Sequence, residues 1–150
     1  MKNTIFLLAL LLVSAGLPAW AALGQYEGSV TSDQQRLKSA DVVRTLATYK
    51  VHQLTTTNGT TVREYVSPQG KVFGVAWQAS FMPDMNQLLG DYINNLQSAQ
   101  AAQTKTVHHR ALMVNTSDFV YVNYGRLGFW RGYAYAPSLI PNNVSVEVVK

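Results

Sequence analysis

From Val42 to Trp77 the chain alternates between apolar and polar residues with a period of two. This alternation is typical of β-strands with one buried face. Asn58-Gly59 and "SPQG" at residues 67–70 interrupt it. Asn-Gly suits a two-residue type I′ turn, and Pro68 with Gly70 suits a bulged turn. The pattern predicts three strands joined by two hairpins.

These two turns set the register that the sequence predicts. Thr55 is expected opposite Val62, His52 opposite Tyr65, and Tyr65 near Phe73. One face of the sheet would then carry His52, Leu54, Arg63, Tyr65, Phe73, Val75 and Trp77. The other would carry Val51, Val62, Val66, Val72, Gly74 and Ala76. A strand that is apolar on both faces lies inside a sheet covered on both sides, or beside a binding site.

The period changes to that of a helix after Pro83. Apolar residues recur at i, i+3, i+4, i+7, i+8 and i+11, at Met85, Leu88, Leu89, Tyr92, Ile93 and Leu96. This stripe predicts one long amphipathic helix. A shorter helix is predicted from a cap at Ser32, with Gln35 three residues later, to about Ser39. Residues 22–30 are expected to form an irregular arm.

Strand patterns return in "HHRALMVN", "FVYVNY" and "FWRGYAYA", and Val144 to Val149 is a candidate edge strand. The order of elements is a helix, three strands, a long helix, and three or four strands. The predicted fold is α+β, with an antiparallel sheet of about six strands and the long amphipathic helix packed on it.

The first 21 residues have the features of a secretory signal peptide. Lys2 precedes an apolar run, and Ala19-Trp20-Ala21 places small residues where a signal peptidase reads. The alternative is a retained anchor, but the apolar run is shorter than the roughly 20 residues that span a bilayer. We expect cleavage after Ala21, one exported domain over residues 22–150 without a transmembrane segment, and a periplasmic or secreted location.

Composition removes several classes of function. The chain has no cysteine, which excludes disulfides, thiol catalysis and thiolate metal sites. Lys and Arg number 12 against 8 Asp and Glu, and loss of Lys2 reduces the net charge from +4 to +3. The basic residues form no continuous run, so no nucleic-acid partner is predicted. No cofactor is predicted.

Catalytic motifs give little support to an enzyme. His108 and His109 are adjacent, so on a strand they point to opposite faces and do not share a metal ion with His52. No G-x-S-x-G elbow is present. Four carboxylates could serve glycoside cleavage, but no pattern pairs them: Glu27, Glu64, Asp84 and Asp91. A binding protein is therefore favoured, and an envelope hydrolase stays as the alternative.

Aromatic residues interleaved with arginines are the main remaining signal. They are typical of recognition surfaces, although strand aromatics also fill cores. The predicted binding residues are Arg63, Tyr65, Phe73, Trp77, Trp130 and Arg131. Trp130 and Arg131 follow a glycine-rich turn and are expected to be exposed. The partner would be an envelope protein or a small ligand, and a small-ligand carrier is a further alternative.

"VREYVSPQGKVFGVAWQ" and "MPDMNQLLGDYI" resemble a family of exported bacterial proteins described as a domain of unknown function. The hairpin motif YVSPxGKVFxVAW, the "AWAALG" segment and the strand at residues 49–52 carry the resemblance. It covers most of the chain after residue 21. It implies an exported proteobacterial protein, and it transfers no catalytic or binding residue.

Overall fold

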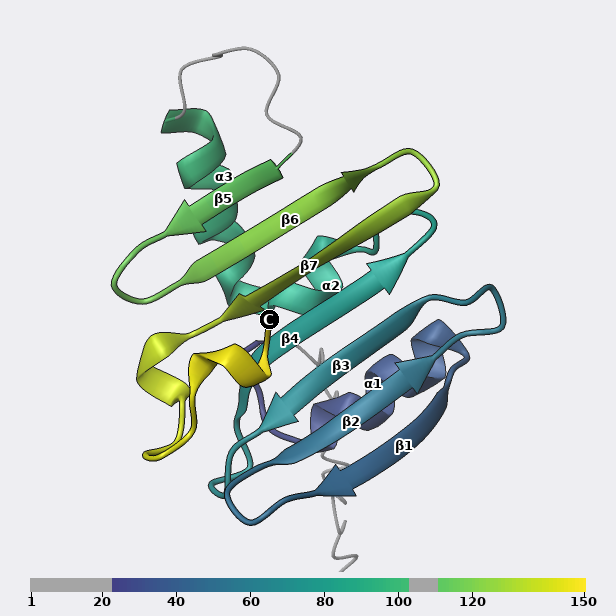
Figure 1. Cartoon of the computed structure of the whole chain (residues 1–150), viewed down its shortest axis with the longest axis vertical. Coiled ribbons are helices and arrows are strands. Elements are labelled where there is room, and N and C mark those ends of the chain that lie inside the picture. Colours follow the sequence, from purple (N-terminus) through teal and green to yellow (C-terminus); the bar gives the residue numbers. More distant parts are fainter. Residues whose placement is uncertain (1–22, 103–110) are drawn as a thin grey trace, which may run out of the picture.

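The computed structural model describes residues 23–102 and 111–150. These residues form one seven-stranded antiparallel sheet in the order β1-β2-β3-β4-β7-β6-β5. The helices lie on one face of the sheet, and the C-terminal segment lies on the opposite face, which we call the open face (Figure 1). The fold is α+β, as predicted, but the sheet has seven strands rather than six.

The elements have the following bounds. The strands are β1 (Ala40–Thr45), β2 (Lys50–Thr55), β3 (Thr61–Val66), β4 (Val72–Ala79), β5 (Ala111–Asn115), β6 (Val120–Arg126) and β7 (Phe129–Tyr135). The helices are α1 (Gly28–Leu37), α2 (Met85–Leu89) and α3 (Ile93–Ala102), with short 3-10 turns at η1 (Gly90–Tyr92), η2 (Pro137–Leu139) and η3 (Val146–Val148).

The long helix that the apolar stripe predicts extends from Met85 to Ala102 as α2, η1 and α3 in succession. Asp84 caps its start by accepting a hydrogen bond from the Asn86 backbone N–H at 2.9 Å. Gly90 has φ +52 and interrupts the α-helical geometry. Leu88, Leu89 and Leu96 are buried against the sheet. The run carries the chain from the centre of the sheet to its far edge at β5 (Figure 1).

The N-terminal part of the domain differs from its prediction. α1 begins at Gly28, four residues before the predicted cap at Ser32. The arm before it is held in place, since Leu23 is buried and its N–H donates to the Leu88 carbonyl. The strand missing from the prediction is β1, of which five of six residues are exposed, so its pattern of apolar residues is weak. Residues 144–149 contain η3 and form no edge strand.

The first hairpin has a longer turn than predicted. The Thr56 N–H donates to the Thr60 carbonyl, and in this turn Gly59 alone has positive φ. A type I′ turn needs positive φ at two residues, so the predicted turn type is wrong. Leu54 therefore pairs with Val62, and His52 pairs with Glu64. The predicted pairing was displaced by one residue.

The second hairpin contains a β-bulge at Phe73. Val66 pairs with Val72 and Tyr65 pairs with Gly74, which leaves Phe73 as the extra residue. A bulge inserts one residue into the alternation, so every later side chain changes face. Val75 and Trp77 consequently lie on the helix-covered face, whereas Tyr65 and Phe73 lie on the open face. The prediction of a single face with Tyr65, Phe73 and Trp77 is wrong for this reason.

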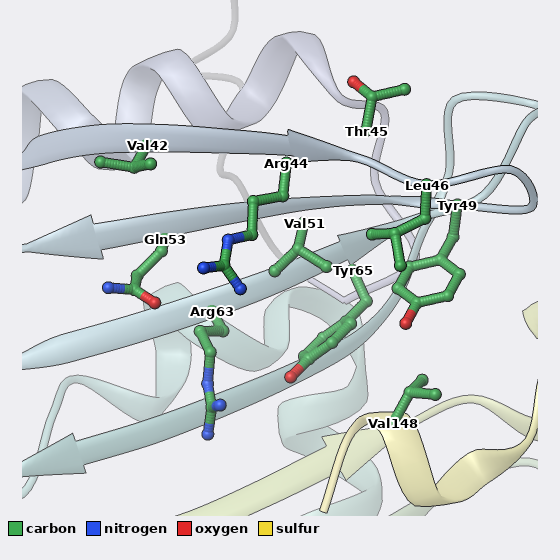
Figure 2. Close-up of a pocket in the computed structure, with 10 residues that line it drawn as sticks. All are labelled: Val42, Arg44, Thr45, Leu46, Tyr49, Val51, Gln53, Arg63, Tyr65 and Val148. Carbon is green, nitrogen blue, oxygen red and sulfur yellow. The ribbon is translucent and has the colours of Figure 1, made fainter.

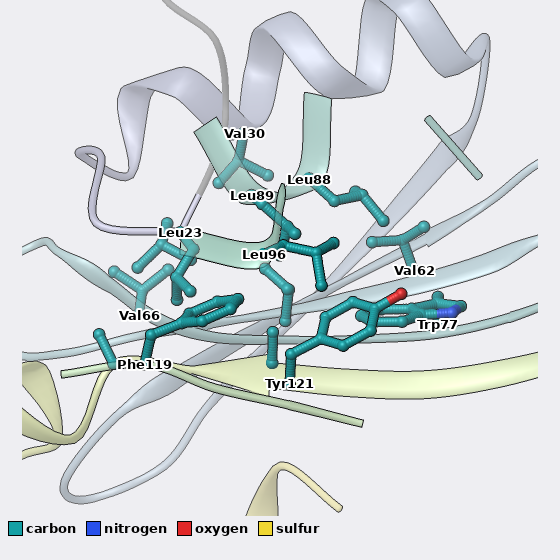
Figure 3. Close-up of a cluster of buried hydrophobic side chains, with 14 of the residues drawn as sticks. Leu23, Val30, Val62, Val66, Trp77, Leu88, Leu89, Leu96, Phe119 and Tyr121 are labelled. Atoms are coloured by element: carbon teal, nitrogen blue, oxygen red, sulfur yellow. The ribbon is translucent and has the colours of Figure 1, made fainter. Parts of the chain in front are cut away.

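Each face of the sheet has its own core. Under the helices, Trp77 and Tyr121 lie 5.6 Å apart between ring centroids (Figure 3). The Trp77 indole N–H donates a hydrogen bond to Asn123. On the open face, Tyr65, Phe73 and Ala76 pack against Val149 of the C-terminal segment. That segment covers only part of the open face, and the remainder forms the candidate site.

Candidate functional site

The open face carries a groove of about 600 Å³ over the first three strands. β1, β2 and β3 supply its floor, and the turn between β1 and β2 supplies Leu46 and Tyr49 (Figure 2). Val148 from η3 closes one end. The full lining is Val42, Arg44, Thr45, Leu46, Tyr49, Val51, Gln53, Arg63, Tyr65 and Val148.

Strand alternation brings the key side chains of this groove together. Arg44 pairs with Val51, which pairs with Tyr65, so these three form one row across the sheet. Gln53 and Arg63 form part of the next row. Arg44, Gln53 and Arg63 lie along one side of the groove, and Tyr49, Tyr65 and Val148 lie along the other (Figure 2). A polar side therefore faces an aromatic and aliphatic side.

The aromatic side packs on Phe73, which lies beneath it. Phe73 is completely buried, and its ring centroid lies 6.0 Å from that of Tyr49 and 6.1 Å from that of Tyr65. Burial raises the pKa of Tyr65, which outweighs the opposite effect of the nearby Arg63 charge. The phenol of Tyr65 therefore stays protonated, as a hydrogen-bond donor.

The polar side holds two uncompensated positive charges. Arg44 and Arg63 are both exposed, and neither makes an ion pair or a side-chain hydrogen bond with any residue that the structure describes. A guanidinium group presents a rigid fork of donors that fits a carboxylate or phosphate. This side of the groove is therefore suited to an anion.

Seven of the eight acidic residues lie away from the open face. Of the eight, Glu147 in η3 is the one on the side of the open face, and it is paired with Lys150. Asp41 and Glu64 project from the sheet toward α1, and Asp118 accepts a hydrogen bond from Asn95 of α3. The others belong to the helical layer or the loops beside it: Glu27, Asp33, Asp84 and Asp91. This segregation leaves a positive field over the open face.

The six predicted binding residues occupy three different environments. Arg63 and Tyr65 line the groove, and Phe73 lies directly behind it. Trp77 is 2% exposed beneath the helices. Trp130 pairs with Ala79, is half-buried, and belongs to the helix-covered face, whereas Arg131 is exposed on the open face with its guanidinium 4.5 Å from the Tyr124 ring centroid. Arg44, Gln53 and Tyr49 were not predicted as binding residues, and Arg44 lies on β1, whose weak pattern of apolar residues hid the strand.

A buried carboxyl pair is the strongest titratable feature on the other face. Asp33 of α1 and Glu64 of β3 are 0% and 1% exposed. Asp33 Oδ1 accepts a hydrogen bond of 2.6 Å from Gln87 of α2, but Asp33 Oδ2 and both Glu64 oxygens find no donor among the described residues. A proton on Glu64 supplies that donor, and the two side chains hydrogen-bond to each other.

The titration of this pair follows from its burial. Burial, and then the charge of Asp33, hold the pKa of Glu64 well above its ordinary value. Burial also raises the pKa of Asp33 to about 6. Glu64 was predicted from the sequence as a candidate carboxylate, whereas Asp33 was not. Because no solvent reaches the pair, it has no access to a substrate, and we assign it a structural role.

His52 belongs to a second polar cluster at the edge of α1. Its Nδ1 lies 2.9 Å from Asp41 Oδ2, and its Nε2 lies 3.1 Å from Glu27 Oε1. Glu27 also accepts from Lys50 at 2.9 Å, and this hydrogen bond lowers the pKa of Glu27. Within the described residues, no group of three His, Asp or Glu side chains is arranged to hold a metal ion. His108 and His109 lie outside those residues.

The fold and groove define a small α+β domain with one helix-covered face and one basic, open face. Residues 19–149 match the family model described as "Protein of unknown function (DUF2844)", so the chain belongs to that family. The resemblance to a domain of unknown function is thereby confirmed. No curated protein and no solved structure matches the chain. None of the helices that the structure describes has the length and apolar character needed to cross a membrane.

Proposed function

We propose that this chain is an exported, non-enzymatic binding protein of a proteobacterium. The sequence of residues 1–21 supports a signal peptide removed after Ala21, with residues 22–150 acting in the periplasm or outside the cell. An exported domain without cysteine depends on packing alone for its stability. The two cores on the sheet meet that requirement.

We infer further that the groove binds the carboxylate of an acidic sugar. The observation that carries this proposal is the pair Arg44 and Arg63, both unpaired among the described residues, facing the Tyr49 and Tyr65 side of the groove. Carboxylates accept charge-assisted hydrogen bonds from guanidinium groups. The phenol of Tyr65 and the amide of Gln53 add hydrogen-bonding groups for hydroxyls.

The form of the groove favours a sugar over a fatty acid. The groove is open to solvent, and its lining mixes Val42, Leu46 and Val51 with Thr45 and Gln53. An acyl chain would stay partly in water there, which forfeits the burial that drives its binding. A sugar ring has apolar faces and polar edges, and it matches a mixed lining.

The groove is also better suited to binding than to catalysis. Its lining contains no histidine and no carboxylate. General acid–base chemistry uses such groups most often, within hydrogen-bond reach of the reacting atom. The buried pair of Asp33 and Glu64 lies on the opposite face of the sheet and does not reach the groove.

The test is calorimetric titration of the purified chain with a trimer of galacturonic acid, using maltotriose as the neutral control. We expect the acidic trimer to bind and maltotriose not to bind. Arg44→Gln and Arg63→Gln should each weaken binding about tenfold, since each removes a charge-assisted hydrogen bond. Lys38→Gln makes the same charge change at the end of α1 and should leave the affinity unchanged. If Lys38→Gln weakened binding equally, the effect would come from net charge rather than from the groove, and the proposal would be contradicted.

A further inference from the structure

Three arginines of the open face lie on one diagonal of the sheet. Arg44 of β1 is in the row of Val51 and Tyr65, and Arg63 of β3 is in the next row, opposite Gln53 and Ala76. Arg131 of β7 is in the third row, opposite Gln78. The order Arg44, Gln53, Arg63, Gln78, Arg131 therefore crosses β1, β2, β3, β4 and β7 in succession.

The spacing along this diagonal is regular. Each arginine is displaced from the previous one by two strands and by two residues along the strand. Strands lie about 4.8 Å apart and residues rise about 3.3 Å, so each step is about 12 Å between Cα atoms. Glutamines occupy the intermediate positions. The result is an even array of guanidinium groups separated by amide groups.

The diagonal is accessible along its whole length. All five side chains are exposed, and among the described residues none of the three arginines has an ion-pair partner. Arg63 lines the groove described above and also a second hollow of about 150 Å³, which Arg131 and Tyr133 line as well. Arg63 thus borders both hollows, which lie next to each other on the open face.

We propose that this diagonal is the binding track of an extended acidic polysaccharide that crosses the strands of the open face. The inference rests on the proposed function, because the groove at Arg44 and Arg63 forms one end of the track. Carboxylates along the glycan bind Arg44, Arg63 and Arg131, and its hydroxyls bind Gln53 and Gln78. The Tyr124 ring beneath the Arg131 guanidinium holds that group in position.

The position of the track argues against a peptide partner. An extended peptide that joins a sheet uses the unpaired backbone groups of an edge strand. The diagonal instead passes over β2, β3 and β4, which pair with neighbours on both sides. Recognition there depends on side chains alone, and it suits a ligand that carries polar groups along its entire length.

The track also differs from a nucleic-acid site. A nucleic acid carries a phosphate on every nucleotide, and its affinity depends on neutralising many of them. Stable binding of such a polymer commonly uses 6–10 phosphate contacts, roughly two to three times the number of arginines here.

The test compares galacturonate oligomers of two, three, six and twelve units in calorimetric titrations of the purified chain. We expect the affinity to rise by about tenfold once an oligomer reaches Arg131 as well as Arg63, as one more charge-assisted hydrogen bond would give. Arg131→Gln should abolish this gain and leave the affinity for the trimer unchanged. Arg126→Gln is the matched control, because Arg126 is also an exposed arginine but lies off the diagonal, opposite Phe129.

Circular dichroism establishes that each variant is folded. If the trimer bound but longer oligomers bound no more tightly, the proposal of a track would be contradicted and the proposal of a sugar-binding groove would stand. Failure of every oligomer to bind would overturn both. Poly-glutamate that binds as tightly as polygalacturonate, with the same loss in Arg131→Gln, would overturn the assignment to a glycan and favour an acidic protein partner.

Discussion

Glu64 of β3 and Asp33 of α1 form a hydrogen bond between two carboxyl groups at a site that solvent does not reach. Gln87 of α2 donates to the same Asp33. Two hydrogen bonds thus link β3 to α1 and α1 to α2: the one between the two carboxyl groups, and the one from the Gln87 amide. Such an arrangement is stable only while at least one of the two carboxyl groups is protonated, because two adjacent buried anions repel each other strongly.

The pair should make the protein less stable at alkaline pH. Both groups have a pKa in the folded state above the ordinary value, so their contribution to stability is fully present below the ordinary values. The contribution of Asp33 is lost as pH rises from its ordinary pKa of 3.8 to its folded-state pKa of about 6. The contribution of Glu64 is lost at higher pH, because its pKa is raised well above the ordinary value. For Asp33 alone the loss is on the order of 3 kcal/mol. Urea unfolding midpoints measured between about pH 4 and pH 9 test this loss.

Glu64→Gln isolates this effect, since the amide donates to Asp33 without ionising. The variant should show a flatter dependence of its unfolding free energy on pH, and it should exceed the natural protein in stability at the alkaline end. Glu147→Gln is the control, because Glu147 is exposed and its carboxylate is paired with Lys150. A parallel pH dependence in Glu64→Gln and the natural chain would contradict the shared proton.

Trp77 should behave as a core residue. It is buried beneath the helices and donates to Asn123, so Trp77→Ala should cost about 3–5 kcal/mol of unfolding free energy. Arg63→Ala, on the exposed face of the neighbouring strand, should change it by about 0.5 kcal/mol or less. Denaturant titration of the two variants measures their unfolding free energies. Comparable losses in the two variants would contradict the placement of Trp77 and Arg63 on opposite faces.

The bulge at Phe73 shows which features of the fold could be predicted from the sequence and which could not. The alternation, the turn at residues 67–70 and the helical stripe of Leu88, Leu89 and Leu96 were sufficient to predict an α+β fold. A bulge, however, depends on how two strands meet in three dimensions. Its one-residue insertion moved Trp77 to the other face. Local patterns therefore predicted the elements but not the composition of each face.

The candidate site was harder to predict for a similar reason. Arg63 and Tyr65 were recognised within one hairpin, but Arg44 lies on β1, an edge strand with little burial to shape its sequence. Asp33 and Glu64 lie 31 positions apart and meet only when α1 packs on the sheet. Groups that converge through tertiary packing leave no spacing signature in the chain.

Gly74 accommodates the C-terminal segment. A Cβ at this position would lie 2.8 Å from a methyl carbon of Val149, so Gly74→Ala should displace the segment and cost about 1–3 kcal/mol. Gly28→Ala is the control, since nothing lies within 4 Å of a Cβ there. The double variant Gly74→Ala with Val149→Ala should lose less stability than the sum of the single losses. Strict additivity in a denaturant double-mutant cycle would contradict the contact.

Gln53→Glu should separate stability from ligand binding. Gln53 lies directly opposite Arg63 in the register and is exposed, so a carboxylate there would pair with that guanidinium. A cross-strand pair of opposite charges contributes about 0.5 kcal/mol, and we expect an increase of that size in unfolding free energy. The same carboxylate would neutralise the positive side of the groove, so binding of the galacturonate trimer should fall at least about tenfold.

Gln35→Glu provides the matched change on the exposed side of α1, and it should leave trimer binding as it is. Thermal or urea unfolding gives the stability of both variants, and calorimetry gives their affinities. We expect Gln53→Glu to be more stable and to bind the trimer less tightly. A groove with a purely structural role would not produce this combination. If Gln53→Glu bound the trimer as tightly as the natural chain, the carboxylates of the ligand would not bind at Arg44 and Arg63.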